Sequence, residues 1–209
     1  MQICKMSDFY PHTAPLLPGS VAGGVPDPLL IQTTRRCIRE FCESTGVWRE
    51  WLPSIDLVED QAEYVLAPTY CAEVNGIVEV RINTENGVTN GDDGQQIDRS
   101  DYTFDPELSQ LVLGDAVTPV EDVDEALDVH VMLLPELNED DIAEWLFNRY
   151  FDGLQAYIVY KMGIMPNQPW SLDPGTLRHY LAEYRNNARA KAGNDLASDF
   201  RADSATISA

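Results

Sequence analysis

The stretch GVPDPLLIQTTRRCIREFCESTGVWREWL, Gly24 to Leu52, predicts a helix that leads into an extended segment. Asp27 is a favourable N-cap, and Pro28 suits the first helical position, where its missing N–H leaves no hydrogen bond unmade. Gly46 is a typical C-terminal stop, and an extended pattern begins at Val47. The residues that recur at helical spacing between these ends are Leu30, Thr34, Cys37, Ile38 and Phe41.

An antiparallel β region is expected after this helix. Val78, Val80 and Ile82 alternate with polar neighbours, and Asn86-Gly87 is a strong hairpin signal. The same period of two is found at Tyr102, Phe104, Leu127, Val129, Val131 and Leu133. Strands of this kind bury one face and expose the other to water.

Two further helices are predicted near the C-terminus. The first begins at about Asn138, has acidic residues in its first turn, and runs to about Ile164, a length of roughly 40 Å. Two prolines end it. Asp173-Pro174 starts the next helix, which continues to about Ala192 and is stopped by Gly193.

We therefore expect an α+β protein, in which an α-helical bundle of three main helices carries an inserted antiparallel β domain and an extended C-terminal tail. The expected parts are an extended N-terminal leader over 1–25, a helical core over 26–46 and 138–193, an acidic β-rich insert over 47–137, and the tail over 194–209. The tail has too few large apolar residues to bury a core of its own. This is typical of a segment that becomes ordered when it binds a partner.

The net charge of −21 is concentrated in one block. Residues 56–144 hold 24 acidic residues against Arg81 and Arg99, a net charge of −22, and the rest of the chain sums to +1. Such a block repels nucleic acid and favours cationic partners. The alternative is a solvated surface that only keeps the protein soluble.

The composition, 44% hydrophobic and 23% charged, is typical of a soluble globular protein. No stretch reaches the roughly 18 uncharged apolar residues of a membrane span. The first residues also lack the basic region of a signal peptide. We therefore expect an intracellular chain with no membrane contact.

The sequence contains no phosphate-binding, dinucleotide-binding, serine-nucleophile or zinc-protease motif. His12, His130 and His179 are expected at the surface, without the positioned partner that a general base needs. The acidic loop Asn90–Gly94 lacks the glycine and glutamate positions of an EF-hand. The four cysteines lack metal-ligand spacing and are expected as reduced thiols. We therefore expect no catalytic residue, no metal site and no cofactor.

The four tryptophans are expected to anchor packing. Trp48, Trp51 and Trp145 fit core-facing or interface-facing positions, and Trp170 is expected to plug the link between the last two helices. Truncating a buried tryptophan to alanine would cost about 3–5 kcal/mol of stability.

Two long segments carry an ordered set of motifs. The first, about Pro26 to Pro68, contains P-D-P, then F-C-x-x-T leading to W-R, then D-L-V-x-x-Q-x-x-Y. The second, about Ala143 to Ala192, contains K-M-x-x-M-P-x-x-P-W-S. In this order the segments resemble the head–tail adaptor (connector) proteins of tailed bacteriophages, and the region between them matches in character rather than in residues. None of the motifs is catalytic.

The resemblance implies a structural protein of the virion neck, made in the bacterial host cytoplasm and assembled as a ring, commonly twelvefold, beneath the portal. It also implies a tail or nozzle protein below and phage DNA that passes without sequence-specific binding. In that family the C-terminal tail often docks on the portal, which would make Leu196, Phe200, Arg201 and Ile207 docking residues. The acidic insert could face the lumen and repel DNA, or face outward and bind a basic neighbour.

Two other classes of function are alternatives. An acidic protein can mimic DNA and inhibit a nucleic-acid-binding enzyme, which predicts a basic partner and a monomer or dimer in solution. A small enzyme could instead use paired carboxylates, such as Asp92 and Asp93 with Asp115, but these would have to meet in a cleft with shifted pKa values.

Overall fold

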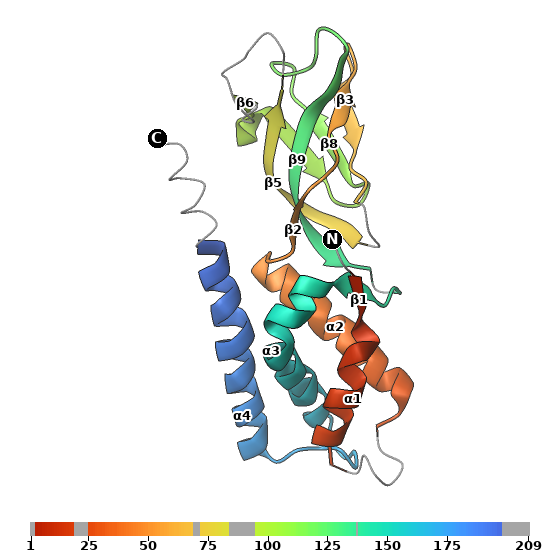
Figure 1. Cartoon of the computed structure of the whole chain (residues 1–209), viewed down its shortest axis with the longest axis vertical. Coiled ribbons are helices and arrows are strands. Elements are labelled where there is room, and N and C mark those ends of the chain that lie inside the picture. Colours follow the sequence, from red (N-terminus) through yellow and green to blue (C-terminus); the bar gives the residue numbers. More distant parts are fainter. Residues whose placement is uncertain (1–2, 19–24, 69–71, 84–94, 137, 198–209) are drawn as a thin grey trace. The chain divides into compact units, whose positions relative to one another are not determined.

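The computed structural model describes residues 3–18, 25–68, 72–83, 95–136 and 138–197 (Figure 1). The fold is mixed α+β with antiparallel sheets. It divides into two compact units, one formed by Met1–Val47 with Pro135–Ala209 and the other by Trp48–Leu134. The first holds the long helices and is called the helical unit below; the second holds most of the strands and is called the sheet unit.

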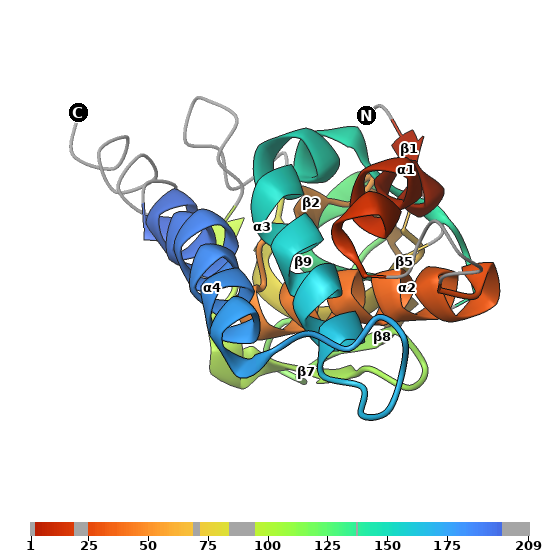
Figure 2. The same cartoon turned by 90° about the horizontal axis from the view of Figure 1, so that it is seen from below.

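The helical unit is built from short N-terminal elements and three long helical segments. In chain order these are β1 (Ile3–Lys5), η1 (Met6–Phe9), α1 (Tyr10–Thr13), η2 (Ala14–Leu16), α2 (Asp27–Thr45), β10 (Asp141–Ala143), α3 (Glu144–Gly163), α4 (Pro174–Tyr184), the π-helical turn η4 (Arg185–Arg189) and a further helical stretch over 190–197. Helix α3 contacts both α2 and α4, as Figure 2 shows from below.

The predicted first helix is confirmed as α2. It ends at Gly46, which takes the left-handed conformation with φ of 59° that a glycine adopts without strain. At the other end the N-cap is Pro26 rather than Asp27, one residue earlier than predicted. Its buried face includes the five residues predicted from their spacing, which are Leu30, Thr34, Cys37, Ile38 and Phe41.

The prediction of an extended N-terminal leader is wrong for the described residues 3–18. This segment forms a short strand and three helical turns, and Met6, Phe9 and Leu17 are buried. The Phe9 ring stacks on Phe151 at 5.1 Å and meets Phe147 edge-on at 4.7 Å. These aromatic contacts with a distant helix fix the leader, and the local sequence does not show them.

The predicted start of the long helix at Asn138 is also wrong. Residues Asp141–Ala143 form β10, which pairs antiparallel with Ile3–Lys5, and α3 begins at Glu144. Ile142 is buried in this strand. The strand forms because β1 supplies backbone hydrogen bonds from the other end of the chain.

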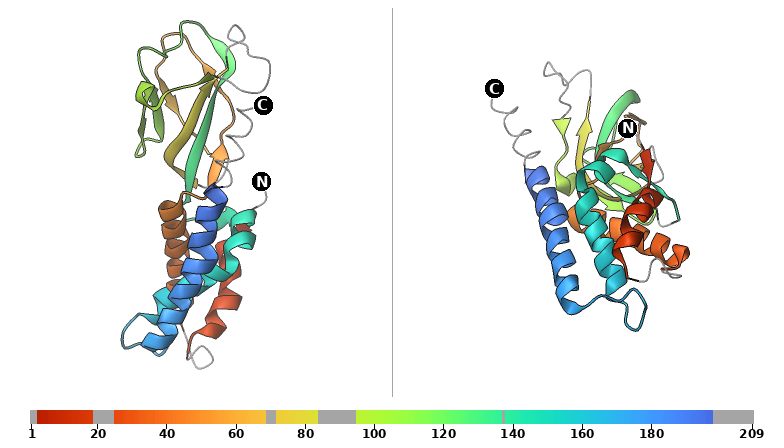
Figure 3. Two further views of the ribbon diagram at one scale, coloured as in Figure 1. Left: turned by 90° about the vertical axis from the view of Figure 1, so that its left-hand side faces the viewer. Right: turned by 60° about the horizontal axis from the view of Figure 1, so that its bottom comes forward.

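The third helix begins as predicted and ends later. Asp173 is its N-cap, with Oδ1 accepting from the backbone N–H groups of Gly175 and Thr176 at 2.8 and 3.1 Å. The predicted stop at Gly193 is wrong, because residues 190–197 remain helical. Figure 3 shows this helical run beside α3.

The sheet unit contains two antiparallel arrays. In one, β9 (Val123–Pro135) pairs with β2 (Arg49–Trp51) and β3 (Ile55–Leu57), and β5 (Ala72–Ile82) links to β6 (Gln95–Gln96). In the other, β8 (Gln110–Leu113) lies between β4 (Glu63–Val65) and β7 (Tyr102–Asp105), after the short helix η3 (Arg99–Asp101). The predicted inward face of β9 is confirmed, since Leu127, Val129, Val131 and Leu133 are all buried. The Asn86-Gly87 hairpin lies outside the described residues.

Candidate functional site

A close contact between α3 and η4 positions the candidate site. A Cβ atom on Gly153 would lie 2.6 Å from the Cβ of Ala188 and 2.7 Å from its backbone nitrogen, so only glycine fits there. The π-helical turn lies at this contact and holds Asn186 and Asn187 at the surface. Single π turns inside helices often occur at functional sites.

Asp195 attaches the end of the last helix to the start of α3. Its carboxylate accepts from Arg149 Nε at 2.7 Å and from the Tyr150 hydroxyl at 2.5 Å, and Lys191 Nζ donates to the Arg149 carbonyl at 2.8 Å. The hydrogen bond from Arg149 holds the pKa of Asp195 below its ordinary value, because it favours the charged form. Burial and the same carboxylate raise the pKa of the Tyr150 hydroxyl. These bonds fix the last described helical turn, which ends at Ala197, to the start of α3.

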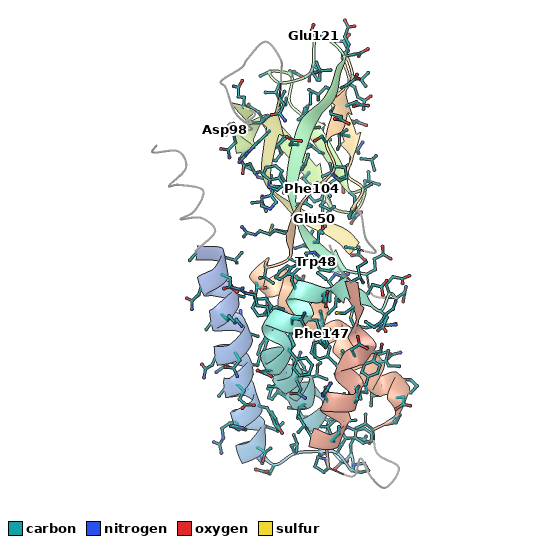
Figure 4. All side chains as sticks on the ribbon, in the orientation of Figure 1. Trp48, Glu50, Asp98, Phe104, Glu121 and Phe147 are labelled. Carbon is teal, nitrogen blue, oxygen red and sulfur yellow. The ribbon has the colours of Figure 1, made fainter. Side chains whose placement is uncertain are left out.

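An open groove of about 780 Å³ lies beside this attachment. Its aromatic lining is Phe147 and Phe151 of α3 together with His12 of α1, whose ring meets Phe151 edge-on at 5.3 Å. Figure 4 labels Phe147 on α3. The polar lining includes four exposed asparagines, Asn148, Asn186, Asn187 and Asn194. The charged residues Arg149, Asp152 and Lys191 complete the polar lining. Asparagine amides both donate and accept hydrogen bonds, so the groove offers aromatic rings together with adaptable polar groups.

A second polar cluster joins the three long helices. The Tyr157 hydroxyl of α3 donates to Glu40 of α2 at 2.6 Å, and Lys161 pairs with the same carboxylate at 2.7 Å. The Tyr157 ring stacks on Tyr184 of α4 at 4.0 Å. Burial opposes ionisation of Glu40, but the bonds from Lys161 and Tyr157 outweigh it and lower the pKa of this carboxyl. The cluster holds the helices in register and leaves no reactive group unpaired.

Of the four predicted docking residues, the structure describes only Leu196. Leu196 is half-buried in the helical stretch after Gly193, so it belongs to the helix rather than to a tail. Phe200, Arg201 and Ile207 lie outside the described residues.

The tryptophans occupy different environments. Trp48 is 1% exposed in the sheet unit, and Trp170 is buried in the link between α3 and α4. Trp145 is half-buried, with its ring edge-on to Tyr150 at 6.4 Å. Trp51 is 41% exposed and is therefore not a core residue in this chain.

Trp51 belongs to a surface cluster on the sheet unit. Its ring stacks on His130 at 4.7 Å, and the Arg81 guanidinium lies 4.8 Å from the ring centre. Arg81 also pairs with Glu79 at 2.7 Å. This mutual stacking accounts for an exposed tryptophan without requiring a ligand.

Seven carboxylates of the sheet unit lie in and beside two loops that meet. The unit, residues 48–134, carries 20 acidic and 3 basic residues, a net charge of −17. The loop after β3 and the loop before β9 lie together, since Glu59 N–H donates to Asp122 at 2.7 Å and Asp60 N–H donates to the Pro119 carbonyl at 3.0 Å. The acidic end, as it is called below, consists of Asp56, Glu59, Asp60, Glu121, Asp122, Asp124 and Glu125. Within the described chain none of these seven forms an ion pair.

Of the residues proposed for alternative chemistry, Asp92 and Asp93 lie outside the described residues, and Asp115 is exposed in a loop. Among described residues, no three His, Cys, Asp or Glu side chains are grouped to hold a metal ion. His179 is exposed and pairs with Glu183 at 3.5 Å on its own helix.

No described helix has both the length and the apolar character needed to cross a membrane.

Sequence reasoning missed the groove and the attachment at Asp195. One signal was available: the adjacent pair Asn186-Asn187 interrupts an otherwise strong helical pattern with poor helix formers. The partner of Asp195 was not visible, because Arg149 and Asp195 are distant in the sequence.

No model of a known protein family matches the chain, and no curated protein matches it.

Proposed function

We propose that this chain is a structural head–tail adaptor of a tailed bacteriophage, which binds beneath the portal through its C-terminal segment. In this proposal α2, α3 and α4 form the adaptor's three-helix bundle, and the sheet unit is the β domain inserted into it. The protein acts by assembly, and no residue is assigned a catalytic role.

The observation that carries the proposal is the attachment of the last described helical turn beside an open groove. Asp195 ties the last described turn to Arg149 and Tyr150, and the open asparagine-lined groove lies next to it. A segment that leaves a rigid surface beside a groove can order on a partner while the rest of the chain stays unchanged. Phe200 and Ile207 supply the large apolar side chains of that segment.

The charge distribution supports the same role. A net charge of −17 on the sheet unit repels the phosphate backbone, so DNA could pass without being bound. If the acidic end faces outward, it would instead bind a basic component of the tail or nozzle. The proposed partners are therefore the portal, a tail or nozzle protein, and further copies of this chain in a ring, commonly twelvefold, at the neck of the virion.

Two deletions test the portal contact. Removing residues 198–209 retains the Asp195 attachment, so we expect a folded protein with an unchanged melting temperature that no longer joins portal-filled heads. Removing residues 194–209 also loses Asp195 and should lower stability. Phe200→Ala alone should weaken docking by about 1–3 kcal/mol, as for an aromatic interface anchor. Heads that complete normally with the shorter deletion would contradict the assignment of the segment.

A second candidate function is inhibition of a nucleic-acid-binding enzyme by mimicry of DNA. The acidic end favours it, since its seven carboxylates form no ion pair among the described residues and carry the same sign of charge as phosphates. It predicts a soluble complex with a basic enzyme at one-to-one stoichiometry. Electron microscopy of virion necks distinguishes the two functions, because only the adaptor would appear there as a ring.

A further inference from the structure

Three arginines form a stripe along the last long helix. Arg178 of α4 and Arg185 and Arg189 of η4 are all exposed. The spacing of seven residues brings Arg178 and Arg185 to one face of the helix, and Arg189 follows at the end of the π-helical turn that begins at Arg185.

The stripe has no acidic partner in the part of the chain that the structure describes. None of the three arginines forms an ion pair there, and the one hydrogen bond is from Arg178 Nε to the Pro174 carbonyl at 3.1 Å. The stripe is separate from the groove, because none of the three residues lines it. Tyr184, Ala188 and Ala192 are the buried residues of the same helical run, and none of the three arginines is among them.

The acidic end of the sheet unit carries the opposite charge to the arginine stripe. Its seven carboxylates form no ion pair with another described residue, and two exposed apolar side chains lie among them, Val58 at 42% and Val120 at 83% exposure. Figure 4 labels Glu121 in this region. Arginine suits such a surface because its guanidinium pairs with carboxylates through two hydrogen bonds and its stem covers apolar side chains.

We propose that the arginine stripe of one copy binds the acidic end of a second copy. The inference deepens the proposed ring and rests on it, since it names the surfaces through which neighbouring subunits meet. Sheet units with a net charge of −17 repel one another when a ring gathers them, so closure needs cations between them. A contact between two different surfaces is heterologous, which is the type that builds rings rather than closed dimers.

A charge swap in the full-length protein tests the contact. The stripe variant carries Arg178→Glu, Arg185→Glu and Arg189→Glu. The end variant carries Glu59→Lys, Glu121→Lys and Asp124→Lys, three side chains that make no hydrogen bond among the described residues. Self-association is measured by sedimentation velocity over a concentration series, at about 50 and about 500 mM salt. Arg36→Glu with Glu107→Lys is the control, because both positions are exposed and lie outside the two surfaces.

Wild-type protein should associate at low salt, with an association constant at least about tenfold lower at high salt. Each variant alone presents like charges on both surfaces and should also lose about tenfold or more. An equimolar mixture of the two variants should associate again, because each then offers the surface that the other needs. The control variant should behave as wild type, and circular dichroism verifies that all variants are folded.

Three outcomes would overturn the contact. They are wild-type protein that stays monomeric at every concentration and salt, a stripe variant that associates as wild type does, and a mixture that fails to restore association. Loss of binding to duplex DNA by the stripe variant, with self-association unchanged, would assign the stripe to nucleic acid instead. A failed self-association test would not refute the proposed portal contact. Both variants keep residues 198–209, so their joining to heads can be measured separately.

Discussion

Substitution of Gly153 by alanine is the sharpest test of how α3 meets the last helix. Helix propensity alone predicts stabilisation by about 1 kcal/mol, because glycine in a helix interior costs that much relative to alanine. The structure predicts the opposite sign. The new methyl carbon would lie 2.6 Å from the Cβ of Ala188, 2.7 Å from its nitrogen and 2.9 Å from the carbonyl carbon of Asn187.

Two of these three atoms are backbone, so the contact cannot be relieved by a side-chain rotation. Overpacking of this kind costs about 1–3 kcal/mol, occasionally more, and separating the two helices also disturbs the π turn. We expect a net loss of up to about 2 kcal/mol after the gain in propensity. For a chain of this size that lowers the melting temperature by up to about 8 °C.

Gly193→Ala is the matched control in the same assay, thermal unfolding followed by far-ultraviolet circular dichroism. Gly193 lies in the helical stretch 190–197, and nothing lies within 4 Å of a Cβ placed there. This substitution should raise stability by about 0.5–1 kcal/mol. Adding Ala188→Gly to Gly153→Ala should recover part of the loss, since it removes the nearest of the three atoms. An increase in melting temperature for Gly153→Ala would refute the reasoning, because it would mean that the helices do not approach this closely.

The remaining predictions concern the attachment and the tryptophans. Asp195→Asn should cost about 1 kcal/mol in thermal unfolding, since the bonds from Arg149 and Tyr150 weaken at a partly exposed site. Because the folded pKa of Asp195 lies below its ordinary value of 3.8, its contribution is present above that pH and lost as the pH falls below it, so wild type and Asp195→Asn should converge in stability in acid. Trp48→Ala should cost about 3–5 kcal/mol and Trp51→Ala less than about 1 kcal/mol in denaturant titrations, because only the first is buried. Trp145→Ala should lower the melting temperature by an intermediate amount, and an unchanged melt would show that its half-buried ring does not contribute to packing.

The sequence alone determined the features that depend on neighbouring residues. The bounds of α2 followed from Gly46 and from the proline-rich start, the cap at Asp173 was visible beside its proline, and the inward face of β9 followed from strict alternation. The concentration of acidic residues was also evident, since charge is additive along a chain. These signals act over a few residues, which is the range of caps, turns and side-chain periodicity.

Only the tertiary structure decided the features that depend on distant residues. The short strand before α3 exists because Ile3–Lys5 pairs with it, and the leader is ordered because Phe9 packs against α3. The last helix continues past Gly193 to Asp195, whose carboxylate meets Arg149 on α3. Backbone pairing, aromatic packing and ion pairs join residues by position in space, so no local pattern specifies them, and the groove beside Asp195 exists only where these contacts bring the helices together.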